Sequence, residues 1–234
     1  MMESLCINSY LGNGHEFHLY LYDPVDHVPE GTTIKDANEI IPRDEVFKDI
    51  FGSYANFANK FRFTLLYEKG SWWVDMDTVC LKPFDFTENY IFSSESSDPY
   101  HRVLVNNTYM KSPPRAKFLK DCLSFIDTRG YTNIHWGELG INLMSRMIFR
   151  NELDKYIRPP EYFCPISFYN LGFITGNSAY HISANTYAIH LWHDVWRRQN
   201  LDKNRPYPIN SVYEMLKMKY KVHEQFGKSE YTCI

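Results

Sequence analysis

The residues whose types and spacing could do chemistry are two aspartates one position apart, Asp75 and Asp77, in the segment KGSWWVDMDTV. In an extended strand, residues two apart point to the same face about 6–7 Å from each other, so we expect the two carboxylates to converge. Burying a carboxylate without a partner is costly. One hard divalent cation would cancel the repulsion, and two carboxylates with open coordination positions suit Mg²⁺ or Mn²⁺ bridging a diphosphate. The alternative is a solvated strand end at which two acids happen to fall.

A basic residue, Arg62, lies on a helix that we expect just before the two aspartates. Apolar side chains recur at every fourth position through residues 56–69, which predicts an amphipathic helix, and Gly70 stands where a helix commonly ends. Asn59 and Arg62 are three positions apart and therefore share one face of that helix. Arg62 could turn toward the aspartates and bind a carboxylate or a phosphate. As a surface residue it would instead pair with Glu68.

Composition limits the class of protein. The chain has 234 residues, 44% of them hydrophobic, and we expect residues 1–234 to form a single domain. With 23% charged residues and a net charge of −3, a nucleic acid polymer is not expected as a partner. The five cysteines lack any C-x-x-C spacing, so we expect free thiols rather than a disulfide framework or a structural zinc site. The sequence shows no transmembrane segment and no signal peptide, which predicts a soluble, cytoplasmic protein and leaves peripheral contact with a membrane open.

The other segments alternate between helix and strand patterns, which indicates the α/β class. We expect helices within residues 3–14 and at 56–69, 116–126 and 138–153, strands at 16–22, 72–79, 91–93, 103–105 and 187–191, a strand or turn at 40–42, and an irregular segment at 156–169.

The segment FRFTLLYEKGSWWVDMDTVCLKPFDF resembles the core of the DXD-containing sugar transferases of the capsular polysaccharide type. These are related to yeast-type mannosyltransferases, α-1,4-galactosyltransferases and the glucosyltransferase domains of large bacterial toxins. Their pattern is S-D-x-x-R-x-x-x-L-Y-x-x-G-G-x-[YW]-x-D-x-D, and the positions that match it here are Arg62, Leu66, Tyr67, Gly70, Trp73, Asp75 and Asp77. GHEFHLYLYD, WGELGINL and AIHLWHDVWRR resemble further segments of the family, so the resemblance covers most of the chain.

The resemblance implies a GT-A type, Rossmann-like domain that moves a sugar from a nucleotide-diphosphate donor to a hydroxyl of a carbohydrate or glycolipid acceptor, with retention of anomeric configuration. It implies that Asp77 binds Mn²⁺ (or Mg²⁺) directly, while Asp75 contacts the donor and the metal shell. Arg62 would contact the donor sugar or diphosphate, and Trp73 would lie beside the donor. The metal would neutralise charge on the departing nucleoside diphosphate.

Four further residues are candidates for the same site. His190 and Trp192 share one face if the expected strand continues through them, so that His190 would complete the metal or β-phosphate site and Trp192 would cap the donor. A histidine satisfied within an aromatic cluster is the alternative. Glu138 and Asn142 follow a glycine at an expected helix start, a place suited to contacts with a diphosphate or an acceptor sugar, although capping alone also favours an acid there.

The sequence departs from the family pattern at several points. Asn59 stands where the resemblance places an aspartate that holds donor hydroxyls, so a neutral amide is the candidate donor contact there. Ser71 replaces the second glycine, and Gly140-Ile141 replaces a Gly-Pro pair. The family's first strand, with its I-W-x-G segment, has no counterpart, so the chain is expected to be truncated at its amino end relative to the family. A missing strand would leave sheet edges unpaired, and we expect reduced or absent activity.

Two other functions compete with sugar transfer. WWVDMDTV also fits the D-x-D-x-[TV] motif of haloacid-dehalogenase-like phosphatases, in which Asp75 would be the nucleophile and Asp77 the general acid. No convincing G-D-x-x-x-D follows. The other possibility is a degenerate, non-catalytic homologue that binds the donor weakly or binds only another protein.

Overall fold

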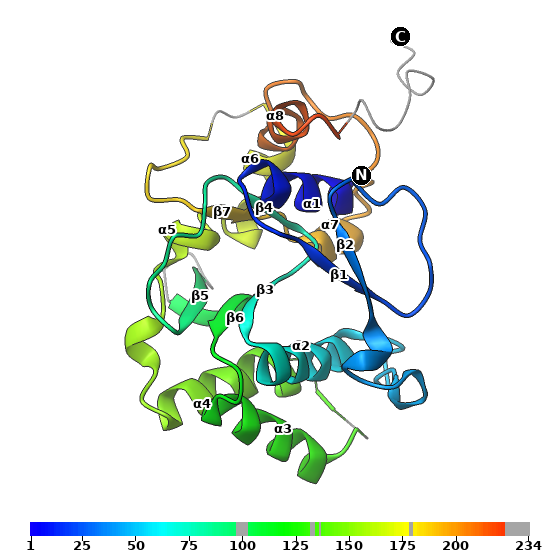
Figure 1. The fold of residues 1–234 in the computed structure, drawn as a ribbon. Coiled ribbons are helices and arrows are strands. Elements are labelled where there is room, and N and C mark those ends of the chain that lie inside the picture. The colour runs from blue at the N-terminus through cyan, green and yellow to red at the C-terminus, as the bar shows by residue number, and fades with distance from the viewer. Residues whose placement is uncertain (97–102, 132–133, 136, 178–179, 223–234) are drawn as a thin grey trace.

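The computed structural model describes residues 1–96, 103–131, 134–135, 137–177 and 180–222, and these form a mixed α/β structure with small sheets (Figure 1). In the first sheet, β1 (His18–Leu21) pairs in parallel with β2 (Thr33–Asp36). In the second, β6 (Val103–Ser112) lies between β3 (Ser71–Val74) and β5 (Ile91–Ser96), with both pairs antiparallel. In the third, β4 (Thr78–Cys80) pairs antiparallel with β7 (Ala188–His190).

The α-helices of the described residues are α1 (Met2–Gly12), α2 (Ala55–Lys69), α3 (Lys117–Arg129), α4 (Leu143–Arg150), α5 (Pro160–Phe163), α6 (Leu171–Thr175), α7 (His193–Arg198) and α8 (Val212–Lys219). Local sequence explains several of their ends. Helix α2 ends at Gly70, whose φ of 68° suits glycine. Helix α8 begins after Ser211, whose side chain accepts a hydrogen bond from the Glu214 N–H at 3.2 Å, as expected for Ser-x-x-Glu.

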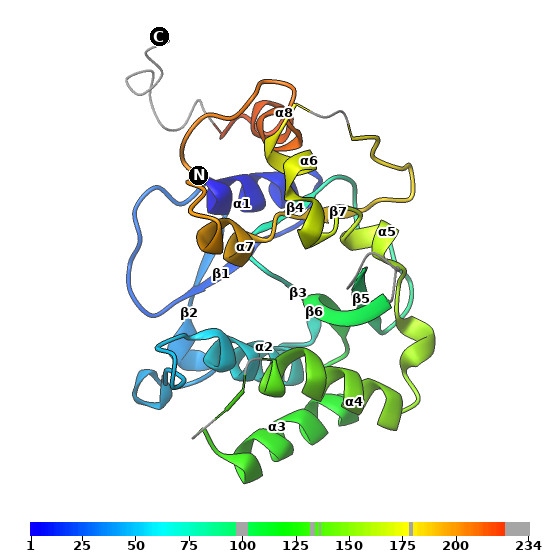
Figure 2. The ribbon, with the colours of Figure 1, turned by 180° about the vertical axis from the view of Figure 1, so that it is seen from behind.

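The apolar core is divided into two large clusters. One lies among α1, α6, α7 and α8 around the β4–β7 pair, and it includes the buried Leu5 and Trp196. The other lies among α2, α3 and α4 beneath β5 and β6, and it includes the buried Phe63 and Phe118. From behind, the two groups of helices are seen above and below the level of the central strands (Figure 2).

Most expected elements are confirmed, but two differ in ways that affect the site. The expected strand at 72–79 is two strands, β3 and β4, which join different sheets, so the aspartates lie in the turn between them. Residues 40–42, expected to be a strand or turn, form no strand; residue 40 lies in a turn, and β2 lies earlier, at Thr33–Asp36. The helix expected at 138–153 is a π-helical turn, Glu138–Asn142, followed by α4, because Gly140 has non-helical φ and ψ. The segment 156–169, expected to be irregular, contains the short helix α5.

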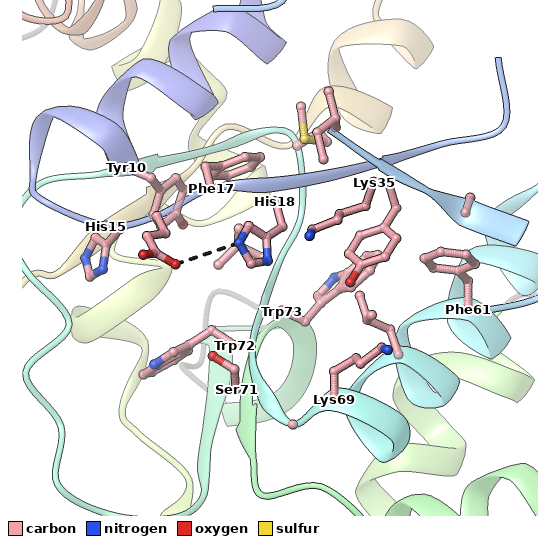
Figure 3. Close-up of a pocket in the computed structure, with 18 of the residues that line it drawn as sticks. Tyr10, His15, Phe17, His18, Lys35, Phe61, Lys69, Ser71, Trp72 and Trp73 are labelled. Atoms are coloured by element: carbon pink, nitrogen blue, oxygen red, sulfur yellow. Dashed lines mark ion pairs between the residues drawn. The ribbon is translucent and has the colours of Figure 1, made fainter. Parts of the chain in front are cut away.

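Of the strands in the described ranges, β6 alone is paired with a strand on both sides, and the edges of β1 and β3 border the same space. Among the described strands, β1 pairs with β2 alone and β3 pairs with β6 alone. Both strands border a hollow of about 880 Å³, which also contacts α1 and α2 (Figure 3). No helix in the described ranges is long and apolar enough to cross a membrane.

Candidate functional site

The turn that carries Asp75 and Asp77 is anchored through its backbone. The Asp75 N–H donates to the Thr108 carbonyl of β6 at 3.0 Å, and the Leu191 N–H donates to the Asp77 carbonyl at 2.8 Å. The Thr78 hydroxyl closes the turn on the Asp75 carbonyl at 2.7 Å. The expectation that the two carboxylates share a strand face is therefore wrong. They are brought together by a turn that is held between β6 and the end of β7.

Asp75 is paired with the arginine that the sequence singled out. Arg62 Nη2 lies 3.1 Å from Asp75 Oδ1, and the Trp73 indole N–H donates to the same oxygen at 2.7 Å. The guanidinium also lies over the Trp73 ring, 5.0 Å from its centroid. The alternative partner, Glu68, pairs with Arg115 instead, at 3.0 Å. Burial raises the pKa of Asp75, with a contribution from Asp77, although the charge of Arg62 opposes the shift.

Arg62 is held in turn by an asparagine that the sequence analysis missed. Arg62 Nη1 donates to the Asn107 carbonyl of β6, and Asn107 Nδ2 donates to Asn59 Oδ1 at 2.8 Å. Asn59 is 8% exposed and its amide lies against Gly140. Asn59 therefore acts on the aspartates through Asn107 and Arg62. The signal available in the sequence was the polar pair in VLVNNTYM, a strand that is otherwise largely apolar.

Asp77 is held by the segment that follows β7. Its Oδ2 accepts a hydrogen bond from the His193 N–H at 2.9 Å and lies 3.2 Å from His190 Nε2. Burial opposes ionisation, but the charge and hydrogen bond of His190 and the His193 N–H prevail and lower the pKa of Asp77 to about 2. Burial likewise opposes the protonation of His190, but Asp77 holds the pKa of His190 well above its ordinary value.

Trp192 does not continue the strand, which ends at His190. It has a φ of 62° and precedes α7, so the expectation of a shared strand face is wrong. Its ring nevertheless lies 3.9 Å from the His190 ring, centroid to centroid. Its indole N–H donates to the Ile166 carbonyl at 2.8 Å, and the side chain is buried. The structure thus places Trp192 as a packing partner of His190.

Glu138 and Asn142 lie in the π-helical turn that packs on α2 and β6. Glu138 Oε1 pairs with Arg129 at 2.6 Å, and Oε2 accepts from the His135 N–H at 3.0 Å. These bonds lower the pKa of Glu138, with the His135 N–H the larger cause. The carboxylate is therefore used to organise the turn. The Asn142 N–H donates to the Gly137 carbonyl at 3.1 Å.

A second polar group behind His190 was also missed. Glu95 is 9% exposed, and its Oε2 accepts from Asn106 Nδ2 at 2.8 Å. The same amide lies 3.2 Å from the Cys164 sulfur. Burial raises the pKa of Glu95. In the chain as described, His190 Nδ1 is buried without a hydrogen-bond partner. Glu95 therefore places a second buried acid close enough to His190 for their charges to interact.

The free oxygens of the two aspartates decide whether a cation fits. In the described ranges, Asp75 Oδ2 and Asp77 Oδ1 take part in no hydrogen bond, while the other oxygen of each carboxylate is held. One free oxygen from each of two oriented carboxylates fits Mg²⁺ or Mn²⁺, whose remaining ligands are usually water and substrate phosphate. Among the described His, Cys, Asp and Glu side chains, no group of three or more could hold a metal. The structure directs His190 Nε2 at Asp77, so His190 orients a candidate ligand.

Comparisons with known proteins give little beyond this geometry. No protein-family model matches the chain, and no curated protein matches it. Among solved structures, the chain is similar to one titled "PaToxG Glycosyltransferase", with a TM-score of 0.48 and 13% sequence identity. The likeness covers 64% of this chain, and the chain spans 63% of that structure's length.

Proposed function

We propose that this chain is a metal-dependent glycosyltransferase of GT-A type that moves a sugar from a nucleotide-diphosphate donor to a hydroxyl of a carbohydrate or glycolipid acceptor. The observation that supports this most is the turn between β3 and β4, where Asp75 and Asp77 each have one oriented and one free carboxylate oxygen. The buried Arg62 beside them suits a diphosphate. The match to the DXD sugar transferase pattern also supports the proposal. We propose further that the transfer retains the anomeric configuration of the sugar.

The chain's own residues would prepare the site for a cation and a diphosphate. Asp75 and Asp77 would hold Mn²⁺ or Mg²⁺ through their free oxygens, and the bound ion would supply charge neutralisation for the departing nucleoside diphosphate. Trp73 fixes the rotamer of Asp75 through its indole N–H. His190 and the His193 N–H do the same for Asp77. Such hydrogen bonds to ligating carboxylates maintain affinity and geometry.

Arg62 would provide the protein's positive charge at the diphosphate. It is 7% exposed and already has Asp75 and the Asn107 carbonyl as partners. Its guanidinium has five N–H donors, so it can keep these partners and still donate to a phosphate. Positioned donors of this kind stabilise charge that develops on a leaving group. We expect slow turnover, because β3, the strand that leads into Asp75, has an unpaired edge along the hollow beside Trp73.

A titration with Mn²⁺ and nucleoside diphosphates tests the proposal. Calorimetry of UDP and GDP binding should show Mn²⁺-dependent binding that Asp77→Asn weakens at least about tenfold, or about 1.4 kcal/mol. Asp23→Asn is the control, because Asp23 is an exposed acid that pairs with Arg43 at 2.6 Å and contacts none of the site residues. If neither nucleotide binds in a Mn²⁺-dependent way, or if Asp77→Asn binds as well as the natural chain, the proposal is wrong.

Turnover separates the competing functions. Incubation of the chain with Mn²⁺ and a panel of nucleotide sugars should release nucleoside diphosphate slowly, and more slowly still for Asp77→Asn. Binding without any release would favour the non-catalytic donor-binding homologue. An acyl-phosphate on Asp75, detected by mass spectrometry after incubation with a phosphate ester, would establish the phosphatase instead.

A further inference from the structure

Trp192 has a backbone conformation that a residue of its kind disfavours. Its φ of 62° and ψ of 48° lie in the left-handed helical region, where the Cβ of an L-residue comes too close to the following carbonyl oxygen. A bulky residue is an outlier there, and such residues persist only where the surrounding structure over-determines them. The contacts around Trp192 must therefore stabilise this conformation.

The two chain neighbours of Trp192 bind one and the same aspartate. The Leu191 N–H donates to the Asp77 carbonyl at 2.8 Å, and the His193 N–H donates to Asp77 Oδ2 at 2.9 Å. The two acceptor atoms belong to one residue, whereas N–H groups two residues apart in an extended chain are about 6–7 Å apart. The compact backbone of Trp192 brings the two N–H groups together on Asp77.

The Trp192 side chain is fixed by a hydrogen bond and by ring contacts. Its indole N–H donates to the Ile166 carbonyl at 2.8 Å. Its ring lies 3.9 Å from the His190 ring and 5.6 Å from the Phe168 ring, centroid to centroid, and the residue is buried. These contacts stabilise one position of the side chain, and they offset the strain in the backbone that carries it.

The direction of the His193 N–H determines which oxygen of Asp77 is free. Oδ2 accepts this N–H and lies 3.2 Å from His190 Nε2, while Oδ1 takes part in no hydrogen bond within the described ranges. If the N–H turned away, the carboxylate would keep only His190 as a partner and would be less restrained. Hydrogen bonds that orient a ligating group typically change metal affinity about 10–100-fold.

We propose that Trp192 is a positioning residue for the metal site: its anchored, left-handed backbone aims the His193 N–H at Asp77 and so presents Oδ1 to a cation. The inference rests on the proposed metal-dependent function, and Trp192 acts through His193 rather than by touching the cation. The competing explanation is that the left-handed residue only turns the chain from β7 into α7. A turn of that kind affects stability and leaves the metal site unchanged.

Two replacements separate backbone conformation from packing. Trp192→Ala and Trp192→Gly both remove the indole and its contacts, but glycine enters the left-handed region readily and alanine does not. Binding of Mn²⁺ alone can be measured by electron paramagnetic resonance as loss of the free-ion signal. It should be at least about fivefold weaker in Trp192→Ala than in Trp192→Gly. A role in packing alone predicts an equal loss in both variants, or a larger loss with glycine.

Hydrogen exchange measured by NMR provides a second readout that needs no metal. The His193 amide of the natural chain should be protected by its bond to Asp77, and its protection factor should be at least about fivefold lower in Trp192→Ala than in Trp192→Gly. Asn200 supplies the matched control, because it is an exposed residue with a φ of 54° just beyond the other end of α7. Asn200→Ala and Asn200→Gly should have equal Mn²⁺ affinities and equal protection at His193.

A milder variant covers the case in which neither replacement folds. Trp192→Phe keeps a ring in the same place and removes the indole hydrogen bond to the Ile166 carbonyl. Mn²⁺ affinity and protection of the His193 amide should then both fall at least about threefold. Values equal to those of the natural chain would overturn the inference.

The outcomes distinguish this inference from the proposed function. If the natural chain binds Mn²⁺ but the alanine and glycine variants bind it equally, the positioning role is wrong and the proposed function stands. If the natural chain binds no Mn²⁺, the proposed function is wrong and the positioning role falls with it. A difference within the Asn200 pair as large as that within the Trp192 pair would show a general effect of left-handed residues, and it would also overturn the inference.

Discussion

A methyl group at Gly140 should disturb the site from outside it. A Cβ built on this glycine would lie 2.6 Å from Asn59 Nδ2, 3.0 Å from its Cγ and 3.1 Å from its Oδ1. All three atoms belong to one buried amide, which is held by Asn107 at 2.8 Å. The amide cannot retreat without losing that hydrogen bond. We therefore expect Gly140→Ala to displace Asn59 and loosen Asn107, which also accepts from Arg62.

The cost has two parts. Overpacking a tight site costs about 1–3 kcal/mol, and loss of one buried hydrogen bond costs about 1 kcal/mol. Gly140→Ala should thus lower the free energy of unfolding by about 2–4 kcal/mol, which for a chain of this size lowers Tm by roughly 5–15 °C. Because Arg62 loses part of its support, Mn²⁺-dependent nucleoside diphosphate binding should weaken as well.

Urea unfolding followed by circular dichroism measures the effect, and two further variants serve as controls. Gly172→Ala places a Cβ in open space within α6, where alanine is the better helix former by about 1 kcal/mol, so stability should stay the same or rise. In an Asn59→Ala background the clashing amide is gone, and Gly140→Ala should then cost less than about 1 kcal/mol. The reasoning is wrong if the free energy of unfolding of Gly140→Ala lies within about 0.5 kcal/mol of that of the natural chain. It is also wrong if Gly140→Ala lowers the free energy of unfolding by as much in the Asn59→Ala background as in the natural chain.

Two other predictions follow from the same region. Ser71 has a φ of 74°, so Ser71→Gly should raise the free energy of unfolding by about 1 kcal/mol in urea melts. Gly70→Ala should lower the free energy of unfolding, because the added Cβ would lie 2.6 Å from a ring carbon of Pro114. The pKa of Asp77 is about 2 in the folded chain, against an ordinary 3.8. This difference adds about 2 kcal/mol to the free energy of unfolding; the contribution is fully present above about pH 4 and is lost as the pH falls through about 2. The raised pKa of His190 contributes stability that is present below about pH 6.5 and lost as pH rises through its folded-state value. Urea melts recorded across pH measure how the free energy of unfolding changes with pH. His190→Gln should reduce this change both at acid pH and above pH 6.5. If the change at acid pH is the same in His190→Gln, the Asp77–His190 pair is not its source.

Local patterns predicted the parts of the structure that depend on nearby residues. The four-residue spacing of apolar side chains located α2, which spans Ala55–Lys69, and its last residue precedes Gly70 as expected. The same helix geometry placed Asn59 and Arg62 on one face, and both act in the network around Asp75. Such predictions succeed because helix periodicity and the conformational freedom of glycine are properties of short segments.

The candidate site departed from prediction wherever distant segments compete for the same residues. A strand through Asp75 and Asp77 agrees with local propensity, but β3 pairs with β6 while β4 pairs with β7, and the chain has to turn between these partners. Trp192 belongs to the same alternation by sequence, yet the strand ends before it and its ring packs in the core. Asn107 was missed because its importance comes from the two side chains it joins.

The sequence by itself determined which chemical groups are present: two closely spaced carboxylates, an arginine one helix earlier, and aromatic residues throughout. The tertiary structure alone decided how they meet. It directs one oxygen of each aspartate into hydrogen bonds, aims His190 at Asp77, joins Asn59 to Arg62 through Asn107, and leaves the edges of β1 and β3 open. The physical reason is that burial, charge pairing and backbone hydrogen bonding are properties of groups far apart in the chain, and they are settled only when the chain packs.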